Sequence, residues 1–153
     1  MTRFVCVSMS TLILLLGSAC GVAAPAAPTV SAATPPASAA GDSAQVEVTL
    51  ADNTIASSLT TFKVGVPYTF VIKNNGNHQH NFNINQPVSV TGSEDASLNS
   101  ALLTVREDQL PIGGGTTVHY SFPPSSAGTA LEFSCLIRRH YELGMRLAIA
   151  VTN

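Results

Sequence analysis

The chain has 153 residues, 45% of them hydrophobic and 10% charged, and its formal net charge is −2. This length provides for one ordinary domain and argues against a multidomain enzyme, and three cysteines are too few for a disulfide scaffold. Because the charge balance is far from the strongly basic one of nucleic-acid-binding proteins, we expect no nucleic-acid partner.

Residues 1–19 have the layout of a secretory signal peptide. Arg3 gives a positive start, a short apolar run follows, and small residues precede Cys20. The apolar run is too short for a stable transmembrane helix. A cysteine at this place resembles the acceptor in a bacterial lipoprotein signal, so we expect lipidation of Cys20. Gly17 stands where such signals usually have an aliphatic residue, so cleavage of an unlipidated secreted protein a few residues further on is the alternative.

Residues 20–44 are predicted to form a disordered, lipid-anchored tether. Residues 21–44 include ten Ala and four Pro, and such a segment has little apolar surface to bury while its prolines block regular hydrogen bonding. The tether would hold a folded domain, residues 45–153, near a membrane. We therefore expect a bacterial lipoprotein on the extracytoplasmic face of a membrane, in the periplasm or at the cell surface.

The segment from residue 45 onward has the pattern of a β domain. Residues 45–50 alternate polar and apolar side chains, which is the period of a half-buried strand. Turn-forming residues separate the later apolar stretches, and these predict further strands at 60–64, 68–73, 80–84, 116–122, 130–135 and 146–151. One short helix is predicted at 94–105, with Ser93 as its N-cap. We expect an all-β sandwich of seven to eight strands.

Potential metal ligands gather near the C-terminus. Cys135, His140 and Met145 form a C-x4-H-x4-M pattern, and two further histidines, His78 and His80, lie upstream. A thiolate, imidazoles and a thioether are the ligand set that suits copper in an electron-transfer site. A strand is expected to end at Cys135 and the loop after it to return to the next strand. Three ligands therefore cluster at one end of the sandwich, and His80 arrives from a neighbouring strand.

This combination resembles the blue copper proteins, the cupredoxins. The resemblance includes an Asn-Asn-Gly turn that precedes a His-Asn-aromatic sequence beginning at His80. It implies a Greek-key β-sandwich that binds one mononuclear type 1 copper through His80, Cys135, His140 and Met145. It also implies that Asn81 forms hydrogen bonds between the two ligand loops and fixes the site before the metal arrives.

Two features of the ligand loops depart from a simple match. His78 competes with His80 as a ligand, because residues two apart in a strand point to the same face. We favour His80, since His78 sits next to the Asn-rich turn. Many relatives have Ser or Thr after the cysteine, where this chain has Leu136, so only backbone groups remain there to bond Asn81.

His119 lies in the middle of a predicted strand and is interpreted as a structural or surface residue.

The resemblance implies a one-electron carrier rather than an enzyme. A copper nitrite reductase or multicopper oxidase needs further copper sites, and the chain's four histidines, two of them already assigned, cannot supply them. A binuclear copper centre would need a second cysteine in the ligand loop. A copper-delivery or copper-resistance protein with the same ligands is the alternative function.

Two arginines, Arg138 and Arg139, precede the ligand His140 directly. We expect a monomer in which this pair forms a basic cap that docks an acidic redox partner, such as a cytochrome or a membrane redox complex. Solvated loop charge is the alternative interpretation of the pair.

Overall fold

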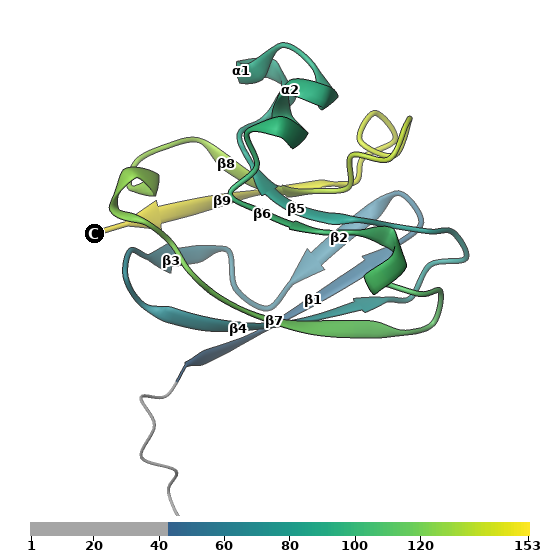
Figure 1. The fold of residues 1–153 in the computed structure, drawn as a ribbon, viewed down its shortest axis with the longest axis horizontal. Helices are drawn as coiled ribbons and strands as arrows, with labels where there is room; N and C mark the ends of the chain where they lie inside the picture. The colour runs from purple at the N-terminus through teal and green to yellow at the C-terminus, as the bar shows by residue number, and fades with distance from the viewer. Residues whose placement is uncertain (1–42) are drawn as a thin grey trace, which may run out of the picture. The chain divides into compact units, whose positions relative to one another are not determined.

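The structure is a computed structural model that describes residues 43–153 (Figure 1). The predicted signal peptide, the predicted lipid site Cys20 and nearly all of the predicted tether lie outside these residues. Within the described part of the chain, no helix is long and apolar enough to cross a membrane.

The first sheet is built from strands whose side chains alternate between the core and the surface. Its strands are β1 (Ala44–Ala51), β2 (Thr54–Ser57), β4 (Pro67–Asn74) and β7 (Gly115–Ser121), in the order β2-β1-β4-β7. In β1, Val46, Val48 and Leu50 are buried, as the period-2 pattern predicts. β1 pairs with β4 in parallel and ends with Leu50 opposite Asn74, so the chain leaves both strands at the same end of the domain.

The second sheet supplies the strands that carry the ligand loops. Its strands are β3 (Thr61–Lys63), β9 (Arg146–Thr152), β8 (Leu131–Ser134), β5 (Phe82–Asn85) and β6 (Leu103–Val105), in that order across the sheet. β8 lies between β5 and β9 and is antiparallel to both. Every residue of β5 and β8 is buried. The packing of these two strands therefore fixes where the segment before β5 and the segment after β8 are attached to the domain.

Aromatic side chains fill the space between the two sheets. Phe62 is fully buried, and its ring lies 4.9 Å from that of Phe122 and 5.7 Å from that of Phe133, centroid to centroid. Phe133 is also 5.0 Å from Phe82. Burial of one such ring contributes about 1.5–3 kcal/mol. The aromatic cluster therefore anchors β5 and β8, and with them the segments that carry the metal-ligand candidates.

The predicted all-β sandwich is confirmed, with two short helices where one was expected. α1 (Val88–Thr91) and α2 (Glu94–Asn99) lie on the side of the second sheet that faces away from the first (Figure 1). Ser93 caps α2, since its hydroxyl accepts a hydrogen bond from the N–H of Ala96. Two 3-10 turns, Glu107–Gln109 and Pro124–Ser126, complete the elements.

The predicted helix over 94–105 is too long. α2 ends at Asn99, and the predicted last turn is instead the strand β6, which pairs with β5 through Leu103 opposite Ile84. The second sheet therefore gains an edge strand at the expense of the helix, because pairing and burial in the sheet outweigh local helix propensity. The strand β2 was not predicted either.

Candidate metal centre

Three potential ligand atoms meet at one end of the sandwich. His80 lies just before β5, Cys135 just after β8, and His140 in the loop that joins β8 to β9. The strand predicted over 80–84 begins only at Phe82, so His80 belongs to a loop rather than to a strand. Their side-chain ligand atoms all lie within 4.8 Å of one another, although 55 residues separate His80 from Cys135.

The three atoms form a triangle of the size that one metal ion requires. Nδ1 of His80 lies 3.2 Å from Nδ1 of His140 and 3.9 Å from Sγ of Cys135, and Sγ lies 3.4 Å from Nδ1 of His140. The point equidistant from the three atoms is about 2.0 Å from each, close to the bonds of about 2.0–2.3 Å that zinc, a neighbouring metal, makes with His nitrogen and Cys sulfur. A single first-row transition metal therefore fits between these side chains without rearrangement.

Met145 closes the same site. Its side chain is fully buried and lines a cavity of about 220 Å³ together with both histidines of the triangle. Backbone hydrogen bonds fix it there, since the N–H of Met145 donates to the carbonyl of His140 and its own carbonyl accepts from the N–H of Cys135, both at 3.0 Å. A thioether in this position completes the ligand set expected for blue copper.

Asn81 connects the two ligand segments. Its Oδ1 accepts a hydrogen bond of 2.8 Å from the N–H of Leu136 and one of 2.9 Å from the side-chain amide of Asn83. Leu136 has no hydroxyl, so its backbone N–H makes this contact. The bond joins the residue after His80 to the residue after Cys135, and both segments are thereby held before any metal binds.

Burial keeps the triangle uncharged in the metal-free protein. Burial disfavours the charged form of each group. It therefore raises the pKa of the Cys135 thiol and lowers the pKa of His80 and of His140. The imidazoles are then free to donate a lone pair at neutral pH, whereas the thiol must lose a proton. Metal uptake therefore releases a proton, and the affinity for metal rises with pH.

Asp52 is a neighbour of the site that the sequence analysis did not identify. It follows β1, lines the same cavity, and its Oδ1 lies 3.0 Å from Nδ1 of His78 and 3.4 Å from Nε2 of His80. The hydrogen bond from His78 is the main cause that holds the pKa of Asp52 well below its usual range. The exposed side chain of His78 thus directs its Nδ1 to Asp52, and His78 is not among the residues of the triangle.

We predict that His78→Ala leaves the copper spectrum of the protein nearly unchanged. His78 is 70% exposed and its Nδ1 already contacts Asp52, whereas Nδ1 of His80 faces the sulfur of Cys135. The measurement is the visible and electron paramagnetic resonance spectrum of the copper-loaded variant beside that of His80→Ala, which should lose the site. Loss of the spectrum in the His78 variant alone would transfer the ligand role to His78.

Arg138 and Arg139 are both exposed on the ligand loop. Neither forms an ion pair with another residue of the described chain. Arg139 has a backbone φ of 73°, which is uncommon for a residue with a side chain. Both arginines therefore lie exposed on the loop next to His140, without an ion pair to another described residue.

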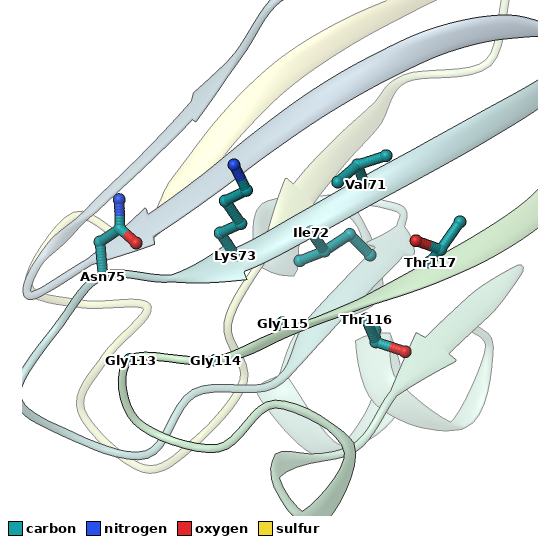
Figure 2. A pocket seen from close by; sticks show the side chains of 9 residues that line it. All are labelled: Val71, Ile72, Lys73, Asn75, Gly113, Gly114, Gly115, Thr116 and Thr117. Atoms are coloured by element: carbon teal, nitrogen blue, oxygen red, sulfur yellow. The ribbon is translucent and has the colours of Figure 1, made fainter.

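A second pocket lies beside strands β4 and β7 and the glycine run at 113–115 (Figure 2). It measures about 330 Å³. Lys73 is its only charged residue, and none of the predicted ligands lines it. His119, on β7, forms a hydrogen bond of 2.9 Å with the hydroxyl of Thr69 and is not part of the triangle.

Comparison with solved structures identifies the fold. A dithionite-reduced auracyanin from the photosynthetic bacterium Roseiflexus castenholzii has a TM-score of 0.55 and 20% identity over 74% of this chain and 100% of its own. Auracyanin A from Chloroflexus aurantiacus, a "blue" copper protein, has a TM-score of 0.54 and 18% identity over 72% and 100%. The fold is that of the cupredoxins. No family model and no curated protein sequence matches the chain.

The ligand candidates indicate which metal the site would hold. The chain's cluster of His80, Cys135, His140 and Met145 fits one type 1 copper site. The chemistry of this ligand set and the size of the triangle thus support the expected cofactor, one mononuclear copper.

Proposed function

We propose that this protein carries single electrons between redox partners on the extracytoplasmic face of a bacterial membrane. The observation that carries the proposal is the triangle of two imidazole nitrogens and one sulfur, whose size fits one metal ion. Copper bound there would supply the exchange between its Cu(I) and Cu(II) states. Hydrogen bonds of Asn81 and Met145 tie the ligand segments together, which would keep the reorganisation small when copper changes its oxidation state.

The two histidines have different access to a partner. His80 is 1% exposed, whereas His140 is partly exposed, on a loop that also carries the exposed apolar side chain of Leu143. An electron therefore has its shortest route to the surface through the ring of His140. Leu143 gives this surface an apolar contact next to that ring.

Reversible electrochemistry of the copper-loaded protein separates a carrier from a copper-delivery or copper-resistance protein. A carrier cycles many times between its two oxidation states and retains copper against competing chelators in both. A protein that surrenders Cu(I) to a chelator during cycling is a delivery protein instead. We propose a carrier and not an enzyme, because the ligand set of this site is the one that suits copper in an electron-transfer centre.

We further propose that Arg138 and Arg139 dock an acidic partner, such as a cytochrome. Changing both to Gln should slow electron transfer with an acidic partner at low salt by up to about tenfold, because exposed charge steers encounter. The salt dependence should flatten, since screening acts over about 8–10 Å. Positive charge beside the metal favours Cu(I), so the variant's reduction potential should fall modestly.

The control is Lys63→Gln, which removes one positive charge, against two in the double variant, at the end of β3 opposite Thr152, away from the ligand loop. Stopped-flow rates across a salt series are the measurement. Rates that fall with salt equally in the double variant and in the wild type would assign the two arginines to solvated loop charge.

Membrane attachment is proposed through a lipid on Cys20. The support is the cysteine after a short apolar run and small residues, followed by the Ala- and Pro-rich segment. In a bacterial host, the wild-type protein should fractionate with membranes, and Cys20→Ala should appear in the soluble extracytoplasmic fraction. Mass spectrometry that finds an unmodified N-terminus beyond Cys20 would contradict the lipid and leave export standing.

A further inference from the structure

One nitrogen of the buried ligand histidine has no partner of its own. Nδ1 of His80 faces the triangle, while Nε2 is buried and makes no well-directed hydrogen bond to any described residue. A neutral imidazole that gives the lone pair of Nδ1 to a metal carries its proton on Nε2. Oδ1 of Asp52 lies 3.4 Å from this nitrogen, within a small adjustment of a hydrogen bond.

The carboxylate of Asp52 is held in place by the loop that carries His80. The N–H of Asn77 donates to Oδ1 at 3.0 Å, and the side-chain amide of Asn77 donates to Oδ2 at 3.2 Å. His78 contacts Oδ1 at 3.0 Å. Asp52 therefore does not swing freely in solvent, and its position is set by residues two and three places before the ligand.

Gly76 leaves the space in which the carboxylate and the imidazole meet. A Cβ atom at this position would lie 2.5 Å from Oδ1 of Asp52 and 2.6 Å from Nε2 of His80. Both distances are shorter than a side chain tolerates, so any residue other than glycine would push the two groups apart. The close approach of Asp52 to His80 is thus built into the backbone of the loop.

We propose that Asp52 is a positioning residue for the ligand His80: its carboxylate accepts a hydrogen bond from Nε2–H, fixes the tautomer before metal binds, and makes the imidazole a stronger donor to Cu(II). The proposal rests on the proposed copper function. Carboxylate–histidine–metal arrangements of this kind orient the ring and raise the basicity of the ligand. Asp52 would therefore favour the oxidised state and lower the reduction potential.

The test compares Asp52→Ala and Asp52→Asn with the control Asp108→Asn, which removes an equal charge from an exposed carboxylate beside Arg106. Nitrogen-15 NMR of the metal-free proteins reports the tautomer of His80. We expect the Nε2-protonated form alone in the wild type and in the control, and a mixture of both tautomers in Asp52→Ala. The Asn variant keeps the size of Asp and covers the case in which the Ala variant does not fold.

Two readouts use the loaded site. Cobalt(II) affinity of the metal-free protein should fall by about tenfold or more in both Asp52 variants. With copper, the affinity for Cu(II) should fall tenfold more than that for Cu(I), which raises the reduction potential by about 59 mV.

Two results would overturn the role of Asp52. One is a single Nε2-protonated tautomer in Asp52→Ala, and the other is an unchanged metal affinity and reduction potential in Asp52→Asn. A wild type with the expected tautomer that takes up no copper would instead overturn the proposed function.

Discussion

Cys135→Ser is expected to abolish the intense blue absorption of the copper-loaded protein while the sandwich stays folded. The colour comes from a thiolate bonded to copper, and a serine hydroxyl does not lose its proton under the same conditions. Cys135 is fully buried and contacts both histidines of the triangle. Its backbone N–H, which donates to Met145, is untouched, so the cost in folding free energy should stay within the 1–3 kcal/mol or so of an unsatisfied buried hydroxyl.

Met145→Leu is the matched variant for this measurement. It removes the thioether and leaves the thiolate, so the site should stay coloured with a higher reduction potential, because the axial ligand tunes the copper site. Absorption spectra, copper content per chain and thermal unfolding of both variants complete the comparison. An unchanged spectrum in Cys135→Ser would show that its sulfur is not the ligand.

Asn81→Ala is expected to weaken metal binding and the fold together. The substitution leaves the buried N–H of Leu136 without its acceptor. It also removes one of the two acceptors of the Asn83 side-chain amide. A buried donor left unpaired costs about 1–3 kcal/mol, and loss of a group that orients ligands costs roughly 10–100-fold in metal affinity. The pairing of β5 with β8 would remain, but the ligand segments of His80 and Cys135 would lose the hydrogen bond that joins them beyond the strand ends.

Cobalt(II) titration and denaturant unfolding of the metal-free protein measure the two effects of Asn81→Ala separately. Asn81→Ser is the control, since its hydroxyl can accept from the same N–H and should recover part of both losses. A loss of stability with undiminished affinity would mean that Asn81 supports the fold without organising the site.

The ligand candidates could be predicted from the sequence because their spacing carries the geometry. A loop of fixed length between two adjacent antiparallel strands brings its ends together, so Cys135, His140 and Met145 had to lie close to one another. Two imidazoles, a thiolate and a thioether then indicate copper. The assignment of His80 as a ligand, and of Asn81 as the side chain that joins the loops, came from the family resemblance.

Asp52 could not be predicted in the same way. Its contact with His80 arises from the register of β1 with β4, in which Leu50 lies opposite Asn74. Two residues further along each chain, Asp52 and Gly76 come abreast. Parallel strands far apart in sequence leave no local motif, so the register is visible only in the folded sheet.

The end of α2 was mispredicted for a related reason. No glycine or proline interrupts residues 94–105, and local propensity therefore favours a continuous helix. In the folded chain, the N–H of Leu102 donates to the carbonyl of Ile84, and Leu103 starts the edge strand β6. The partner strand β5, fixed by the aromatic core, decides the conformation there.

The visible spectrum of the oxidised wild-type protein, loaded with copper and measured together with its copper content, tests the assignment of a type 1 site most directly. One copper per chain and an intense thiolate-to-copper band that bleaches on reduction and returns on reoxidation are expected, because the thiol and both imidazoles already surround a space of the right size. A colourless protein, or one that takes up no copper, would contradict the assignment.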